Sequence, residues 1–116
     1  MLNTITVVAH ITAKPEWAVQ IHDALLQAVK ATRLEEGCLH YVLYANMESQ
    51  HQWTMLEQWR DADALAQHIA GAAFGALSTT LNGRALIEVS RLQPASSGAA
   101  VEDVYEPTFW TGNGLP

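Results

Sequence analysis

The chain has 116 residues, of which 49% are hydrophobic and 16% charged, a composition that predicts one folded domain and excludes a disordered chain. Twelve acidic residues against six basic ones disfavour nucleic acid and anionic membrane surfaces as partners. Cys38 is the only cysteine, which excludes an internal disulfide. The sequence has no cluster of cysteine and histidine residues that would predict a metal site. Because we find neither a leader pattern nor an apolar run of membrane-spanning length, we expect a cytoplasmic protein.

The first third of the chain predicts a strand followed by a helix. Residues 2–12 are rich in β-branched side chains and alternate with a period of two, as strands do. Pro15 is typical of the first position of a helix, and apolar residues recur behind it at helical spacing. Gly37 is a suitable stop signal. The sequence therefore predicts one amphipathic helix of about five turns.

The middle of the chain predicts a hairpin. Residues 38–46 and 53–59 both alternate, and a short polar connection joins them, so antiparallel pairing is the simplest arrangement. The period of two places a set of side chains from each strand on one face. These sets are Leu39, Tyr41 and Leu43 in the first strand, and Trp53, Met55, Glu57 and Trp59 in the second.

The last third predicts a second helical region and a final strand. Asp61 is a suitable N-cap, Gly71 divides the helical pattern in two, and residues 85–92 form the last strand. The order β-α-β-β-α-β predicts an α+β, ferredoxin-like split βαβ fold with an antiparallel sheet. We expect this domain to span residues 1–94. We expect residues 95–116 to form a C-terminal tail whose aromatic side chains cover the partner subunit or its pocket, with a frayed tail as the alternative.

Several phrases of the sequence stand in an order that matches a known family. They are TVVAHI and AKP within residues 6–15, EGCLHY at 36–41, EQW at 57–59, and ALAQH at 64–68 followed by Phe74. No single phrase is specific, but the ordered set is. Over residues 2–94 the chain resembles the antibiotic biosynthesis monooxygenase (ABM) family.

This resemblance implies a homodimer, a dimeric α+β barrel in which two sheets pack face to face, with a pocket between each sheet and its helices. It also implies oxidation of a small phenolic or quinol-type aromatic by dioxygen, without a cofactor. The family includes other activities, so a non-oxidative isomerase and an aromatic-binding module without turnover remain alternatives. Haem-degrading members carry an iron-binding histidine where this chain has Ser78, which disfavours haem degradation.

His68 is the candidate catalytic base. It lies three residues after Leu65, near the apolar side of the predicted second helix. Histidine titrates near neutral pH and can accept a proton from a bound phenol. Members of the family often carry a histidine at this position. The alternative, a structural histidine bonded to a carbonyl group of the sheet, remains open.

Glu57 is the second candidate catalytic residue. A buried carboxyl on the strand face it shares with Trp59 could orient His68, or bind a substrate hydroxyl with a raised pKa. The alternative is a structural carboxylate at the edge of the sheet, paired with Arg60, Arg84 or Arg91.

Four residues are predicted to bind the substrate: Trp59, Tyr41, Phe74 and His10. The three aromatic side chains favour a flat ring as ligand, with plain core packing as the alternative. His10 lies on the polar side of the first strand, where the family often carries a polar residue that faces the pocket or the partner subunit.

Overall fold

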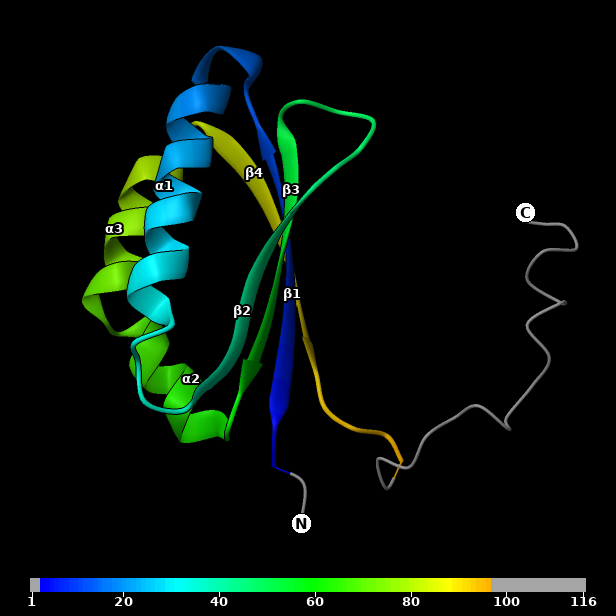
Figure 1. Ribbon diagram of the computed structural model, residues 1–116, viewed down its shortest axis with the longest axis vertical. Helices are drawn as coiled ribbons and strands as arrows, with labels where there is room; N and C mark the ends of the chain where they lie inside the picture. Colours follow the sequence, from blue (N-terminus) through cyan, green and yellow to red (C-terminus); the bar gives the residue numbers. More distant parts are fainter. Residues whose placement is uncertain (1–2, 97–116) are drawn as a thin grey trace, which may run out of the picture.

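The computed structural model describes residues 3–96 as four strands in one antiparallel sheet, with three α-helices on one of its faces (Figure 1). The strands lie in the order β2-β3-β1-β4. This arrangement confirms the predicted α+β ferredoxin-like fold. The elements are β1 (Ile5–Ala13), the 3-10 turn η1 (Pro15–Trp17), α1 (Ala18–Thr32), β2 (Cys38–Ala45), β3 (Gln52–Trp59), α2 (Ala62–Ile69), α3 (Ala72–Leu81) and β4 (Ala85–Leu92).

The first helix is shorter than predicted. Pro15 begins a 3-10 turn, and the α-helix that follows ends at Thr32, so the prediction of five turns ending at Gly37 is wrong. Residues 33–37 form turns, because the amides of Leu34 and Glu35 bond carbonyls only three residues back. The shortening creates a loop that carries Glu35 towards α2.

One residue of β2 breaks the predicted alternation. The register pairs Cys38 with Trp59 but His40 with Gln58, so Leu39 is an extra residue opposite β3. Its side chain is 49% exposed. The prediction that Leu39 shares the buried face with Tyr41 is therefore wrong, and the bulge places Cys38 in the partly buried layer beside the core.

The core lies between the helices and one face of the sheet, which we call the inner face. Side chains of β1 and β3 alternate between buried and less buried positions, as predicted for the second of these strands. The helices add apolar side chains from their sheet-facing sides. The buried apolar residues include Val7, Ala9 and Ile11 of β1, Trp53, Met55 and Trp59 of β3, Ile21, Leu25 and Val29 of α1, Leu65 of α2 and Leu81 of α3.

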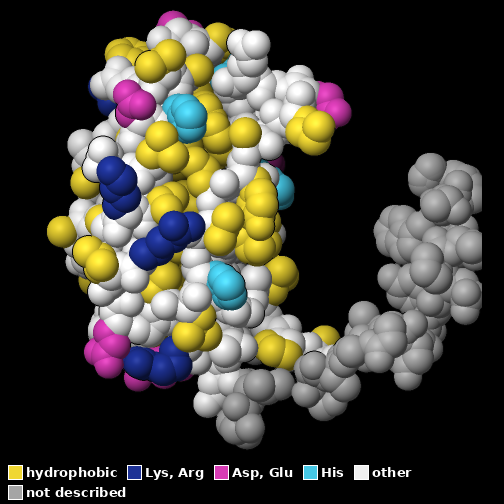
Figure 2. Space-filling model, in the orientation of Figure 1, with side chains coloured by type: hydrophobic (Ala, Val, Ile, Leu, Met, Phe, Trp, Pro, Cys, Tyr) yellow, Lys and Arg dark blue, Asp and Glu magenta, His cyan; other side chains and the backbone are white. Residues whose placement is uncertain are grey.

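The other face of the sheet, the outer face, is covered by none of the described elements (Figure 1). Its exposed apolar side chains include Leu86 at 63% and Tyr44 at 53%. Figure 2, in the same orientation, shows hydrophobic side chains reaching the surface along the sheet, with charged ones mostly on the helix side and at the ends. Within residues 3–96, no helix is long and apolar enough to cross a membrane.

Gly37 joins the loop after α1 to the start of α2. Its φ of 86° lies in the left-handed region, and its carbonyl accepts a hydrogen bond of 2.8 Å from the amide of Arg60. A Cβ atom on this residue would overlap the Cβ of Ala64. The loop and the helix therefore meet through bare backbone, which only glycine permits.

We predict that Gly37→Ala destabilises the protein by about 2–5 kcal/mol, because it adds backbone strain to a steric overlap. The matched control is Gly83→Ala, where φ is 77° but no atom lies within 4 Å of the added Cβ. Strain alone should cost that variant about 1–2 kcal/mol. Urea unfolding measures both losses, and equal losses would contradict the close contact at Gly37.

Candidate functional site

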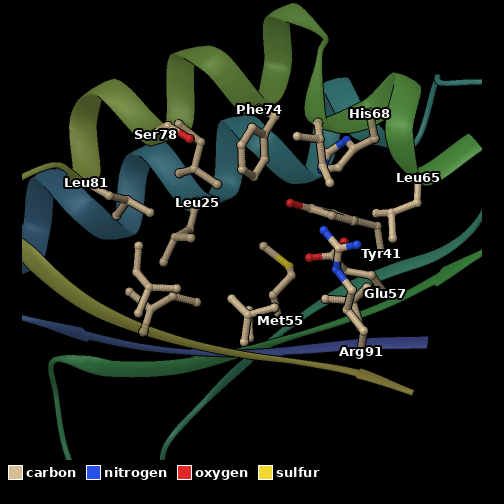
Figure 3. Close-up of a pocket in the computed structure, with 17 residues that line it drawn as sticks. Leu25, Tyr41, Met55, Glu57, Leu65, His68, Phe74, Ser78, Leu81 and Arg91 are labelled. Carbon is tan, nitrogen blue, oxygen red and sulfur yellow. The ribbon is translucent and has the colours of Figure 1, made fainter. Parts of the chain in front are cut away.

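A cavity of about 430 Å3 lies between the inner face and the helices (Figure 3). This volume falls in the usual range for small-molecule sites, about 300–1,000 Å3. Most of its wall is apolar. Its lining residues are Val7, Ala9, Ile11, Leu25, Tyr41, Met55, Glu57, Leu65, His68, Ile69, Phe74, Leu77, Ser78, Leu81, Ile87, Val89 and Arg91.

Most of the polar side chains of the wall lie at one end of this cavity. Figure 3 shows Tyr41, Glu57, Arg91 and His68 there, together with Leu65, whereas Ser78 lies at the other end with Leu25 and Leu81. The strand register explains part of the grouping, because Arg91 pairs with Val7, Val7 with Glu57, and Glu57 with Tyr41. These residues form one row across the inner face. We call the four polar residues the polar end of the cavity.

His68 is 3% exposed and projects from α2 into the cavity wall. Its Nδ1 lies 2.9 Å from the Oε1 of Glu35. In a neutral imidazole ring, a carboxylate partner at Nδ1 favours the tautomer with the hydrogen on Nδ1, which leaves Nε2 as the acceptor. Among the described residues Nε2 has no hydrogen-bond partner. The arrangement is that of a base held in one tautomer.

Glu35, and not Glu57, is the carboxylate that orients His68. The sequence suggested Glu57 for this role, but the hydrogen bond to Nδ1 comes from the loop after α1. The alternative of a sheet carbonyl as partner is wrong as well. Glu35 keeps 26% of its side chain exposed, so it meets water on one side and the imidazole on the other.

Aromatic rings enclose His68. The ring centroids of Trp59, Phe74 and Tyr41 lie 4.5, 5.4 and 5.7 Å from the imidazole centroid. Tyr41 and Phe74 line the cavity, whereas Trp59 is completely buried and lies behind the histidine. Of the three predicted substrate-binding aromatics, Tyr41 and Phe74 line the cavity, whereas Trp59 packs against His68.

Glu57 is 7% exposed and accepts a hydrogen bond of 3.0 Å from the indole Nε1 of Trp59. Burial raises the pKa of Glu57, while the bond from Trp59 and the nearby His68 act in the opposite direction. β3 is an interior strand, so Glu57 is not at the sheet edge. Within residues 3–96 it forms no ion pair with an arginine, so the pairing with Arg60, Arg84 or Arg91 is not observed.

Tyr41 adds a hydroxyl group to the polar end. Burial raises its pKa, and the neighbouring Glu57 carboxyl adds to the increase. The nearby buried side chain of Thr32 acts in the opposite direction, and the phenol is neutral at physiological pH. The backbone carbonyl of the same residue accepts a bond of 3.0 Å from Arg33, which helps to fix this part of β2.

His10 is not brought to the cavity. It lies on the outer face, where its Nδ1 is 3.0 Å from the hydroxyl oxygen of Thr54. Of the two settings that the resemblance implied, this position suits contact with a partner subunit rather than with a ligand in the cavity of its own subunit.

Two residues of the site, Arg91 and Glu35, were not predicted as site residues from the sequence. Arg91 follows Ala85, Ile87 and Val89 at strand spacing, so the alternation alone would have placed it on the inner face. Glu35 had no such signal, because its position depends on where α1 ends. In the part of the chain that the structure describes, no group of three histidine, cysteine or acidic side chains is arranged to hold a metal ion.

The sequence and the fold both match known proteins. The sequence profile of the family described as antibiotic biosynthesis monooxygenase matches residues 4–79. YcnE of Bacillus subtilis (strain 168), whose name gives its monooxygenase activity only provisionally, is 32% identical over 66 residues, or 57% of this chain and 70% of YcnE.

Two solved structures extend the comparison. PA3566 of Pseudomonas aeruginosa is 31% identical, with a TM-score of 0.77 over 83% of this chain and 98% of that protein. SnoaB of Streptomyces nogalater, described as a cofactor-independent oxygenase and solved as a point mutant, has a TM-score of 0.72 over 84% and 99% of the two chains. Its identity is 14%, so this likeness concerns the fold alone.

We predict that Glu57→Gln becomes more stable relative to the unaltered protein as the pH rises. The pKa of Glu57 is higher in the folded protein than its ordinary value of 4.5. The unaltered protein therefore loses stability as the pH rises from 4.5 to the raised pKa, because the unfolded chain ionises first. Glutamine cannot ionise but still accepts the bond from Trp59. Urea unfolding at pH about 4 and about 7 should show that the variant gains stability relative to the unaltered protein at the higher pH.

The matched control is Glu48→Gln, which removes a negative charge from the exposed loop between β2 and β3. A gain of equal size in the control would show that net charge, and not the burial of Glu57, is responsible.

Proposed function

This chain belongs to the antibiotic biosynthesis monooxygenase family, and we propose that it oxidises a small electron-rich aromatic, such as a quinol, with dioxygen and without a cofactor. The observation that carries the proposal is the buried His68, whose Nδ1 is held by Glu35 while its Nε2 has no partner among the described residues beside a largely apolar cavity. SnoaB, described as a cofactor-independent oxygenase, has the same fold.

The proposed reaction begins when Nε2 of His68 takes a proton from a phenolic hydroxyl group of the substrate. The resulting anion gives one electron to dioxygen, and the two radicals combine into a peroxide on the ring. Protonation of the peroxide by His68 and loss of water leave a hydroxyquinone. One oxygen atom enters the product, the other leaves as water, and all four electrons come from the quinol, so no other reductant is needed.

The other residues of the polar end would support this chemistry. Glu35 would hold the imidazole ring in one orientation during proton transfer, because its Oε1 lies 2.9 Å from Nδ1. The neutral hydroxyl of Tyr41 can donate to an anionic oxygen of the substrate or the peroxide. Phe74 and the aliphatic wall exclude bulk water from the reactive pair.

We predict that oxygen uptake with a panel of quinols falls about 100-fold or more in His68→Ala, since a general base contributes on the order of 10²–10⁴ in rate. An oxygen electrode measures uptake by the metal-stripped protein, corrected for autoxidation. The control is His51→Ala, which removes a histidine from the loop between β2 and β3, outside the cavity.

A second variant in the same assay, Glu35→Gln, tests the positioning of the base. The introduced amide can donate as well as accept, so it no longer favours the tautomer with the hydrogen on Nδ1 of His68. We therefore expect kcat to fall and its pH profile to shift, while KM changes little. Full uptake by His68→Ala would remove the proposed base. Turnover of an accepted substrate that continues unchanged without oxygen would favour an isomerase, and binding without any product would favour a binding module.

We also propose that the protein is a homodimer whose outer faces pack together. The register aligns Val42, Leu56 and Val8 in one row at the middle of this face, which is an apolar centre. The next row holds Thr54 and His10, so polar groups border it. An apolar centre with a polar rim is typical of subunit interfaces, and packing would cover a sheet face that is otherwise open.

We predict that Leu56→Lys converts a dimer to a monomer, because it places a charge at the centre of the proposed interface. Light scattering should give twice the chain mass of 12.7 kDa for the unaltered protein and the single mass for the variant. The control is Val19→Lys, on the exposed side of α1, which should remain dimeric. A single mass for the unaltered protein at micromolar concentration would contradict the dimer.

A further inference from the structure

Arg91 is the one arginine that has no partner among the described residues. The chain has four arginines besides its two lysines. Arg33 donates to the carbonyl of Tyr41, Arg60 pairs with two acidic side chains, and Arg84 donates to the carbonyl of Thr80 and lies over the Trp17 ring. Within residues 3–96, no carboxylate forms an ion pair with the Arg91 guanidinium.

Arg91 lies at the polar end of the cavity, near Glu57 (Figure 3). Val7 stands between the two residues in the same row of the sheet. Burial raises the pKa of Glu57, which favours its neutral form and weakens its attraction for the guanidinium. Arg91 is exposed, so its guanidinium lies at the rim of the cavity, and no described carboxylate pairs with it.

The cavity is open beside this charge. β4 is an edge strand, and its inward residues Ile87 and Val89 are 40% and 57% exposed although both line the cavity. A ligand can reach the interior along this strand and would pass Arg91. In a protein of net charge −6, a lone cation at such a mouth reverses the local field for an approaching anion.

We propose that Arg91 binds an acidic group, such as a carboxylate, on the aromatic substrate, so that the site accepts anionic aromatics in preference to neutral ones. The inference rests on the proposed aromatic-binding site and adds the charge of its ligand. A guanidinium can bind a carboxylate through two parallel hydrogen bonds, which also fixes the orientation of the ring.

The row across the sheet sets the spacing. Arg91 and Glu57 are two strands apart, or roughly 10 Å between backbones, and both side chains reach towards the cavity. Arg91 comes from the sheet and His68 from the helix side of the cavity (Figure 3), so a ring held by its acidic group at Arg91 would direct its other substituents towards the helices. Binding and catalysis would then use different groups of one substrate.

The test compares 2,5-dihydroxybenzoate with its neutral amide, two rings of nearly the same shape, by anaerobic calorimetric titration of the full chain. The acid should bind about tenfold tighter or better, as expected for a charge-assisted hydrogen bond. Arg91→Met should abolish the preference, while Arg91→Lys should keep part of it. Lys30→Met, which removes a positive charge from an exposed position of α1, should keep all of it.

Equal affinities for acid and amide, no binding of the acid in the millimolar range, or a preference that survives in Arg91→Met would each overturn the inference. So would a loss of the preference in Lys30→Met, because it would assign the effect to net charge. The two proposals can fail separately. If the acid binds through Arg91 but no oxygen is taken up, this inference stands and the proposed oxidation fails. If only neutral quinols give oxygen uptake, the proposed function stands and this inference fails.

Discussion

The contact between the loop after α1 and the first turn of α2 governs the geometry of the site. The loop reaches the helix because Gly37 has no side chain, and the amide of Arg60 bonds the Gly37 carbonyl at 2.8 Å. Two residues before this contact is Glu35, and one turn after it along α2 is His68. The backbone contact therefore sets the distance between carboxylate and imidazole, and a mobile loop would not hold the histidine in one tautomer.

The polar end contains a carboxyl and a phenol whose charged forms are disfavoured, because burial raises the pKa of both Glu57 and Tyr41. The indole Nε1 of Trp59 donates a hydrogen bond to Glu57, so this carboxyl also has a structural partner. Buried titratable groups with raised pKa values beside a cavity are typical of functional sites, although structural networks shift pKa values in the same way.

The elements that depend on local periodicity could be predicted from the sequence. The alternation in β3 placed Trp53, Met55, Glu57 and Trp59 on one buried face, and the structure confirms each of them. Asp61 caps α2 as expected, and the bond from the Ala64 amide lowers its pKa. Each of these features is set by neighbours within a few residues.

The features that the sequence could not predict depend on contacts between distant segments. The bulge at Leu39 arises from the pairing of β2 with β3, and no residue type announces it. The partner of His68 lies 33 residues away and requires α1 to end at Thr32. The sequence favoured Glu57 because its strand position places it on the same face as the site. A shared face does not determine which carboxylate contacts Nδ1 of His68.

Side chains alternate along each strand, so the two faces of the sheet carry separate sets of residues. In β1, Val7 and Ala9 face the cavity and Val8 and His10 face outwards, so a change in either set leaves the other in place. β4 is the exception, since no described helix covers its inward residues and most of the strand is exposed. The same edge that leaves the core incompletely covered gives a ligand its way in. A helix packed over β4 would bury Val89 and Arg91 and close the cavity, so the exposure of this edge strand keeps the cavity open to solvent.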